Sequence, residues 1–257
     1  MTPGVTQPPR LPPISRLWTL LAAAGAICFA AGLVMAPDRV WPMALLVSFA
    51  VVSAGLAGVF FVALQYATGA CWATALRRVP EAMAALLPAG AVGMVLVLVL
   101  RPTLYPALHV GEGLESTLAF KHAWLARPFV LTRAVVYLVT WLAFARAIVT
   151  TSRRQDQTGD PALGVRNTRL SVAFIVLFAA TYSLACFDWI MALEPEWYST
   201  IFAIYNFGGL FASGLAIIVL GCVWLEQHGP LHGSVTEEHL HDLGKLLFAF
   251  CTFWMYI

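Results

Sequence analysis

Charged side chains are scarce in this sequence. Asp, Glu, Lys and Arg make up 11% of its 257 residues, whereas a typical soluble domain has about 25%. The net charge is only +2 and no basic stripe is present, which argues against nucleic acid as a partner. Hydrophobic residues reach 60%. This composition excludes an ordinary soluble domain and favours an all-α protein embedded in a lipid bilayer.

Metal-binding patterns are also missing. No two cysteines form a C-x-x-C pair, which argues against iron–sulfur clusters, covalently attached haem and zinc. All histidines are predicted in loops, so no membrane span offers an axial ligand to haem. The H-L-H-D run at 239–242 fits no established ligand spacing. We therefore expect no metal or cofactor bound by this chain. The residues concerned are Cys28, Cys71, Cys186, Cys222, Cys251, His109, His122, His228, His232, His239 and His241.

Long apolar segments dominate what is present. Each has roughly the 17–25 residues that a helix needs to cross a bilayer core. A seventh begins near Gly244 and reaches Ile257, about 21 Å at 1.5 Å per residue, short of the ~30 Å core. We expect a polytopic transmembrane helical bundle with six complete spans and a truncated seventh, in a gene that continues past Ile257. The six spans are predicted at 17–36, 40–64, 83–100, 129–149, 170–191 and 201–225.

The N-terminal residues 1–16 are Pro-rich and polar, without a signal-peptide cleavage pattern. They are predicted to be a disordered arm ahead of a transmembrane domain at 17–257. Lys and Arg in the predicted loops then set the orientation. An N-terminus in the cytoplasm places nine of them inside and four outside. The inner set is Arg10, Arg16, Arg77, Arg78, Arg153, Arg154, Arg166, Arg169 and Lys245, and the outer set is Arg39, Arg101, Lys121 and Arg127.

One carboxylate lies inside an apolar run. Asp188 is a few residues from the end of the fifth predicted span, and Glu194 and Glu196 bracket Pro195 in the turn that follows. A charge within a membrane segment is costly and is a functional hypothesis by default. The predicted orientation puts this acidic turn at the outer face, together with the 101–128 loop.

A cation is predicted at the same depth. Pro128 opens the fourth span, and Arg133 follows within two turns. An ion pair between Arg133 and Asp188 would offset part of the desolvation cost of both charges. Tyr137 and Trp141 continue the Arg133 face at i+4 and i+8, and Thr181 shares the Asp188 face. Two interpretations stay open here, a functional pair and one that only locks two helices together.

The run F-D-W-I-M-A-L-E-P-E-W-Y-S-T-I-F at 187–202 resembles the signature of a known family. K-H-A-W-L-A-R-P-F-V-L-T-R-A-V-V-Y at 121–137 and H-L-H-D-L-G-K-L-L-F-A-F-C-T-F-W-M-Y-I at 239–257 are similar to it as well. The family is the second of the two polysulfide-reductase-like (NrfD-like) membrane subunits of alternative complex III, a bacterial quinol:cytochrome c oxidoreductase. The likeness extends over most of the chain from about residue 55.

The resemblance implies more than the residues do. It implies two four-helix bundles plus extra helices, of which this chain would supply the first bundle and the start of the second. It implies the bacterial inner membrane and three partners, which are a sister NrfD-like membrane subunit, a multihaem cytochrome c subunit and an iron–sulfur subunit. Haem c and iron–sulfur clusters would belong to those partners. The matching motif residues are Asp188, Arg133, Glu194, Glu196, His122 and Lys121.

Three functions remain in view. The first is a membrane subunit of an oxidoreductase complex, without a redox metal of its own, that contributes to quinol-side structure and to proton transfer. The family's principal quinol site is attributed to the sister subunit, although this subunit is often labelled quinone-binding. The second is a secondary transporter with Asp188 as coupling carboxylate. The third is a purely structural membrane subunit.

Overall fold

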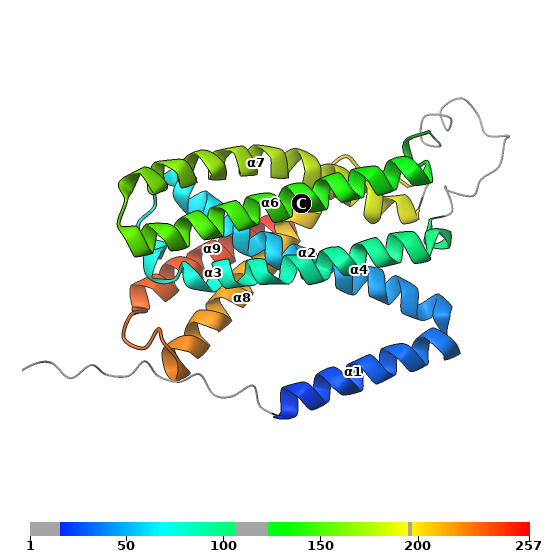
Figure 1. The fold of residues 1–257 in the computed structure, drawn as a ribbon, viewed down its shortest axis with the longest axis horizontal. Helices are drawn as coiled ribbons and strands as arrows, with labels where there is room; N and C mark the ends of the chain where they lie inside the picture. Colours follow the sequence, from blue (N-terminus) through cyan, green and yellow to red (C-terminus); the bar gives the residue numbers. More distant parts are fainter. Residues whose placement is uncertain (1–15, 106–122, 195–196) are drawn as a thin grey trace, which may run out of the picture.

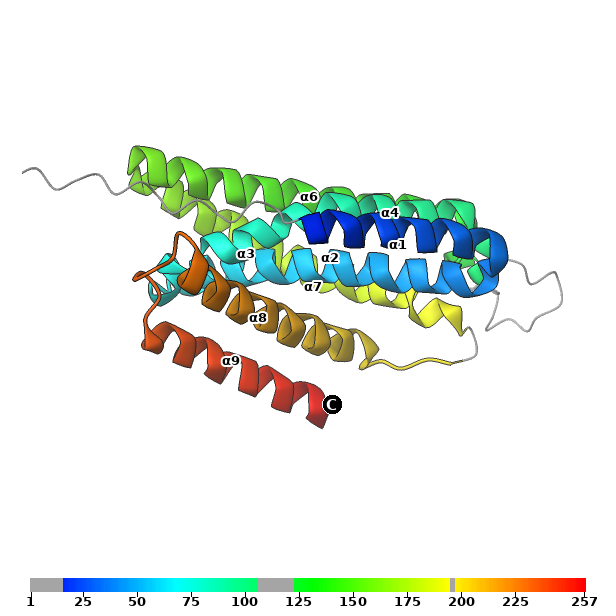
Figure 2. The same cartoon turned by 90° about the horizontal axis from the view of Figure 1, so that it is seen from below.

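The computed structural model describes residues 16–105, 123–194 and 197–257, and within these ranges the chain is helical without any strand (Figure 1). Consecutive long helices run in alternating directions (Figure 2). Short 3-10 turns, η1 (Trp72–Ala75), η2 (Ala84–Leu86), η3 (Pro102–Leu104) and η5 (Met191–Leu193), join or end them. The helices are α1 (Arg16–Met35), α2 (Pro37–Thr68), α3 (Arg78–Met83), α4 (Leu87–Leu100), α6 (Arg127–Thr158), α7 (Pro161–Trp189), α8 (Phe202–His228) and α9 (Glu237–Tyr256).

Five helical segments of the described chain are long and apolar enough to cross a membrane. They make this a multi-pass helical membrane protein, and the count of six complete spans plus a seventh stays a prediction. The apolar part of α1 that can be assessed is Thr19–Met35, which has 17 residues and is at the lower limit of the length that crosses a bilayer core. The five spans are Pro37–Thr68, Arg78–Leu100, Arg127–Thr158, Pro161–Leu193 and Phe202–His228.

The predicted inner loop at 150–169 is wrong, because almost all of it is helical. Helix α6 continues to Thr158, where Gly159 adopts a left-handed conformation (φ 67°) and ends it. Asp160 then caps α7, since its Oδ1 accepts a hydrogen bond from the Ala162 amide at 2.8 Å. Pro161 follows at a position where its missing N–H costs nothing. The two helices thus form a tight hairpin, and both continue past the ends of their apolar segments.

The prediction that every histidine lies in a loop is also wrong. His228 is the last residue of α8, and His239 and His241 lie in the first turns of α9. Helix α9 begins at Glu237 rather than near Gly244, because a capping box fixes its start. The His239 amide donates to the Thr236 hydroxyl at 3.4 Å, and the Thr236 amide donates to His239 Nδ1 at 3.1 Å. Hydropathy alone misses such a polar first turn.

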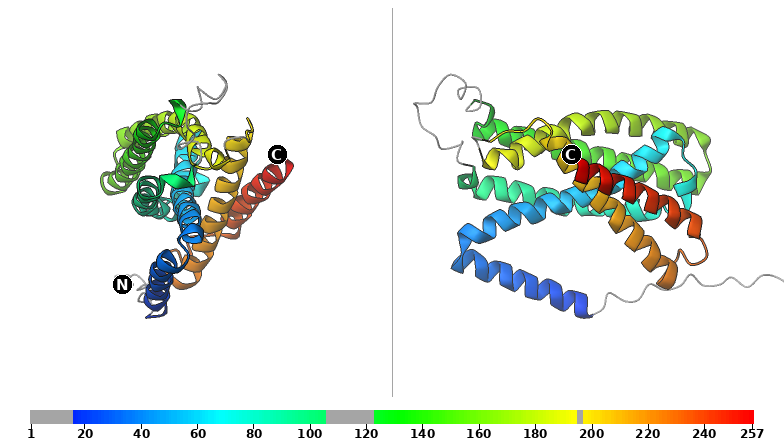
Figure 3. Two further views of the ribbon diagram at one scale, coloured as in Figure 1. Left: turned by 90° about the vertical axis from the view of Figure 1, so that its right-hand side faces the viewer. Right: turned by 180° about the vertical axis from the view of Figure 1, so that it is seen from behind.

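Helix α2 is the centre of the bundle, where it packs against α3, α4, α7 and α8 (Figures 1 and 3). Two glycine contacts allow this crowding. A Cβ on Gly58 would lie 2.4 Å from the Pro80 carbonyl oxygen, and one on Gly214 would lie 2.2 Å from the Ala57 Cβ. Neither separation is possible for real atoms, so both positions require glycine as long as the helices stay this close.

Helix α1 stands apart from the other helices and packs on the first part of α2 (Figures 1 and 3). Gly32 brings it close, since a Cβ there would lie 2.7 Å from Val40 Cγ2. Large apolar side chains of α1, such as Ile27 and Val34, are more than two thirds exposed on the chain surface. In a bilayer such a surface is in contact with lipid tails, so exposure here is not a liability.

Candidate site: a buried arginine–aspartate pair

Arg133 and Asp188 form a two-point ion pair inside the bundle. Arg133 Nε donates to Asp188 Oδ2 at 2.8 Å, and Arg133 Nη2 donates to Oδ1 at 2.8 Å. The residues are 8% and 1% exposed. Arg133 lies near the start of α6, and Asp188 lies near the end of the antiparallel α7, so the hairpin brings them to one depth. The contact predicted from the sequence is confirmed, and its functional role stays a prediction.

Two aromatic residues complete the coordination of the carboxylate. Trp124 Nε1 donates to Oδ1 at 2.9 Å, and the Tyr137 hydroxyl donates to Oδ2 at 3.2 Å. Both Asp188 oxygens therefore receive two hydrogen bonds each. Such charge-assisted bonds are stronger than those between neutral groups. The geometry suits an ionised carboxylate, and a proton arriving at Oδ2 would compete with the longest of the four bonds, that from Tyr137.

Aromatic rings and a carbonyl hold the guanidinium. Arg133 Cζ lies 4.1 Å from the centroid of the Trp124 ring and 4.3 Å from that of Phe129. Its remaining nitrogen, Nη1, donates to the Trp124 carbonyl oxygen at 2.9 Å. Stacking of this kind stabilises a cation more strongly where water is excluded. Each nitrogen of Arg133 thus has a partner, which is the condition for burying such a group at tolerable cost.

Tyr105 links the end of α4 to this site. Its hydroxyl donates to the backbone carbonyl of Trp189 at 2.9 Å, directly after Asp188. Burial raises the pKa of Tyr105, and the negative charge of Asp188 raises it further. The phenol therefore remains a neutral donor at physiological pH. This bond fixes the C-terminal turn of α7 on which Asp188 depends for its position.

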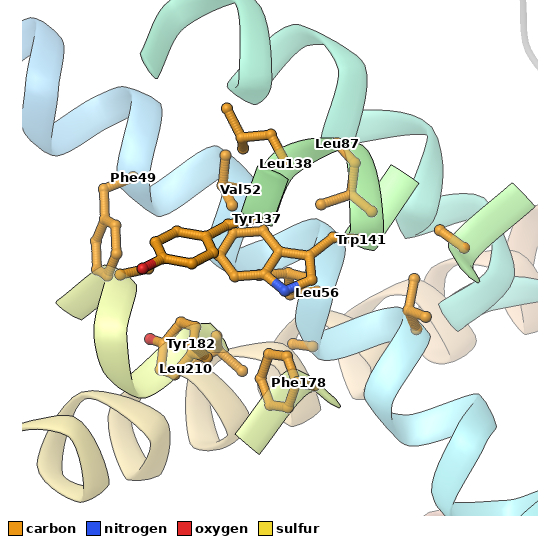
Figure 4. Close-up of a cluster of buried hydrophobic side chains, with 14 of the residues drawn as sticks. Phe49, Val52, Leu56, Leu87, Tyr137, Leu138, Trp141, Phe178, Tyr182 and Leu210 are labelled. Atoms are coloured by element: carbon orange, nitrogen blue, oxygen red, sulfur yellow. The ribbon is translucent and has the colours of Figure 1, made fainter. Parts of the chain in front are cut away.

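On its inward side Tyr137 packs against further aromatic side chains in the buried cluster of Figure 4, where its ring stacks on that of Trp141. Trp141 follows Tyr137 one turn along α6, and its Nε1 donates to the Thr181 hydroxyl at 2.9 Å. Its ring meets that of Trp189 edge to face at 5.7 Å. The indole N–H of Trp189 is buried without a hydrogen-bond acceptor in the described part of the chain. These rings make the Asp188 surroundings apolar on the inward side.

Glu194, the one further predicted site residue that the structure describes, does not join the pair. Glu194 is exposed at the end of η5, and Glu196, His122 and Lys121 lie outside the described residues. Two contributors were not predicted, Trp124 and Tyr105. The signal for Trp124 was its place in an aromatic-rich segment just before the fourth span, where indole rings are common at the interface. No signal in the sequence singled out Tyr105.

A second buried charge lies at the opposite end of the bundle and was not predicted either. Glu81 of α3 is 2% exposed, and it pairs with Arg78. Arg78 also pairs with Asp156 near the end of α6. One guanidinium thus serves two carboxylates and ties α3 to α6. Sequence reasoning treated Arg78 only as a loop cation, because the helix that contains it begins earlier than its apolar part.

Metal-ligating side chains do not cluster in the ranges that the structure describes, where no group of three or more His, Cys, Asp or Glu is placed to hold an ion. The five cysteines are free thiols. Cys186 and Cys222 are buried as expected for small apolar residues, whereas Cys28, Cys71 and Cys251 are exposed on the chain surface.

The fold and the pair define the class, a multi-pass helical membrane protein with a buried ion pair near one end of its bundle. A scan against protein-family models finds no match to this chain, and a search of curated proteins finds no significant match. The resemblance to a subunit of alternative complex III therefore stands on the residues quoted above.

Proposed function

We propose that this chain is a membrane subunit of a respiratory quinol:cytochrome c oxidoreductase of the alternative complex III type. One observation supports this above others. The ion pair joins two of the three stretches that carry the resemblance, because Trp124, Arg133 and Tyr137 belong to 121–137 and Asp188 belongs to 187–202. Residues that are far apart in sequence and similar to one family thus meet at a single buried site.

In this proposal the redox groups belong to other subunits. Haem c and iron–sulfur clusters lie in the multihaem and iron–sulfur partners, and quinol is oxidised mainly at the sister membrane subunit. The N-terminus is cytoplasmic and the membrane is the bacterial inner membrane. Oxidation of a quinol releases protons, and this chain contributes groups that take them up near the outer face.

Asp188 is the proposed proton acceptor and Arg133 the residue that positions it. The Tyr137 hydroxyl, 3.2 Å from Oδ2, marks the position at which a proton reaches the carboxylate. When Oδ2 is protonated, Tyr137 turns away and Arg133 keeps its bond to Oδ1. Glu194, Glu196, His122 and Lys121 are proposed to carry the proton on to the outer solvent. Proton transfer therefore requires Asp188 to lose the hydrogen bond from Tyr137 while it keeps its contact with Arg133.

The test is an Asp188→Asn variant in the intact complex, because the amide keeps the shape and cannot carry the charge. Quinol:cytochrome c turnover and proton release are both measured. We expect one or both to fall, with unchanged absorption from the partner's haem. Asp242→Asn is the matched control, since that carboxylate forms an exposed pair with Lys245 at the other end of the bundle. Tyr137→Phe keeps both charges and probes the entry position alone.

A purely structural role is favoured by a different observation, the four donors that saturate Asp188. A lock between two helices needs that saturation, and a relay does not. Wild-type turnover and proton release in assembled Asp188→Asn complexes would assign the pair to this role.

A transporter is favoured by the interruption of one span. In Arg78–Leu100 the turn η2 separates α3, which holds buried Glu81, from α4. Broken helices are typical of substrate sites in secondary transporters. Proton-coupled solute uptake by proteoliposomes that contain this chain alone would support it, and would contradict the oxidoreductase proposal.

A further inference from the structure

A pocket lies at the end of the bundle opposite the Arg133–Asp188 pair. It has a volume of about 260 Å³ and opens between the ends of α2 and α6, the start of α7, and η1. Gln155 of α6 lines it, which places it about 33 Å along that helix from Arg133 at 1.5 Å per residue. Pockets for whole drug-sized ligands begin at about 300 Å³, so this one suits a smaller group.

The pocket is at the level where the membrane-facing part of the bundle ends. The apolar run of α2 stops at Leu64, directly before Gln65, and that of α7 starts at Leu170, just after Thr168. Both Gln65 and Thr168 line the pocket. Its polar side therefore lies at the level of the lipid headgroups, while Phe61 and Val62 close it toward the buried core of the bundle.

The polar groups of the pocket are linked by hydrogen bonds, and one of their acceptors has no donor in the described part of the chain. Arg77 donates through Nη1 to the Tyr66 hydroxyl and stacks on that ring, 5.4 Å from the centroid. The Tyr66 hydroxyl in turn donates to Gln155 Oε1 at 3.3 Å. The side-chain oxygen of Gln65 is buried, and no donor within the described ranges reaches it. A buried acceptor of this kind is costly unless a ligand or water supplies the donor.

Charge at this site is unbalanced in favour of an anion. Two of the three carboxylates at this end, Glu81 and Asp156, are paired with Arg78, and the third, Asp160, caps α7. Arg77 has no carboxylate partner among the residues that the structure describes, and it lines the pocket. The ends of the helices and turns around the pocket carry three acids, Glu81, Asp156 and Asp160, against six arginines, Arg77, Arg78, Arg153, Arg154, Arg166 and Arg169.

We propose that this pocket binds the headgroup of an anionic, hydroxyl-bearing phospholipid, of which phosphatidylglycerol is the simplest. Arg77 and the Gln155 amide bind the phosphate, and a headgroup hydroxyl donates to Gln65 Oε1. The unpaired Gln65 Oε1 is what makes the pocket specific for a headgroup with a hydroxyl. A choline headgroup has no N–H or O–H to offer Gln65, whereas a glycerol headgroup has two hydroxyls. Basic pockets between helices on the cytoplasmic side are a known setting for anionic lipids.

The test uses the purified full chain, delipidated in detergent, with binding measured by native mass spectrometry. Phosphatidylglycerol and phosphatidylcholine with the same acyl chains are titrated, together with glycerol 3-phosphate and inorganic phosphate as soluble phosphates. We expect phosphatidylglycerol to bind about tenfold more tightly than phosphatidylcholine, the range that satisfying one buried acceptor supports. Equal affinity for the two lipids would overturn the proposal. Glycerol 3-phosphate or inorganic phosphate binding as tightly as the lipid would assign the pocket to a soluble phosphate instead.

Two variants and one control test separately the cation and the acceptor of the proposed lipid site. Arg77→Gln should weaken phosphatidylglycerol binding about tenfold, and Arg153→Gln, which removes an exposed cation at the same end outside the pocket, should leave it within about twofold. Gln65→Leu keeps the charge and removes the acceptor, so it should lower the preference for glycerol over choline headgroups. Equal losses in Arg77→Gln and Arg153→Gln, or an unchanged headgroup preference in Gln65→Leu, would contradict the assignment.

Discussion

Arg133 and Asp188 each offset part of the desolvation cost of the other in an apolar bundle. Removing one partner leaves the other buried and unpaired, which costs roughly 3–5 kcal/mol. We therefore expect Asp188→Ala to lower the free energy of unfolding by about that amount. The measurement is reversible unfolding of the purified chain in mixed micelles, followed by tryptophan fluorescence.

The double variant Asp188→Ala with Arg133→Ala tests whether the pair is the cause. It removes both charges, so its loss should be smaller than the sum of the two single losses, by about 0.5–3 kcal/mol of coupling. Tyr137→Phe is the milder control, because it removes one hydrogen bond and keeps both charges. Strictly additive single losses would mean that the contact contributes nothing of its own.

The sequence predicted the positions of some side chains of the site and not of others. The pair was predictable because two charges in neighbouring apolar spans have few other ways to be buried together. Tyr137 followed from helical spacing, one turn after Arg133. Trp124 did not, since it lies before the helix and its direction depends on the turn that precedes Pro128. Glu81 was missed because α3 begins before its apolar part, so Arg78, three residues earlier, was assigned to a loop and not to the same helical turn.

Among the helices, α2 is the element on which the packing depends, and Gly58 permits its closest approach to α3. We expect Gly58→Ala to destabilise the protein by about 1–3 kcal/mol, because its methyl group would collide with the Pro80 carbonyl oxygen and the helices must separate. Thermal unfolding in detergent, followed by circular dichroism, measures the change.

Gly25→Ala on α1 is the matched control. Apart from the neighbouring backbone of α1 itself, no atom lies within 4 Å of the position that its Cβ would occupy. This substitution should be neutral or stabilising by up to about 1 kcal/mol, because alanine favours the helix over glycine. A similar loss for Gly25→Ala and Gly58→Ala would show that close packing against α3 is not the reason for glycine at position 58.

Helix ends were the least predictable feature of the elements. Hydropathy locates the part of a helix that faces lipid, whereas the backbone ends where a capping residue or a glycine allows it. That is why α6 and α7 run on to Thr158 and back to Pro161. The cues were present in Gly159, Asp160 and Thr236, but they need to be weighed above the change from apolar to polar side chains.

For the whole molecule, orientation is the property that the Lys and Arg distribution predicts. Single cysteines in a cysteine-free background at Thr158, in the α6–α7 hairpin, and at Glu194, after α7, lie at opposite ends of the bundle. We expect a membrane-impermeant thiol reagent to label position 194 in intact cells and position 158 only after lysis. The reverse pattern would place the buried pair at the cytoplasmic side.

The separation of the paired residues along the chain has a consequence for synthesis. Asp188 follows Arg133 by 55 residues, so at about 5–20 residues per second a ribosome makes the anion roughly 3–11 s after the cation. During that interval the nascent α6 holds an uncompensated guanidinium. Helix α6 is therefore stable in the bilayer only after α7 has been made. We expect the two helices to leave the insertion machinery together, as a hairpin. Arrest-peptide force profiles should accordingly show one late pulling event for the two helices, and Asp188→Ala should weaken it.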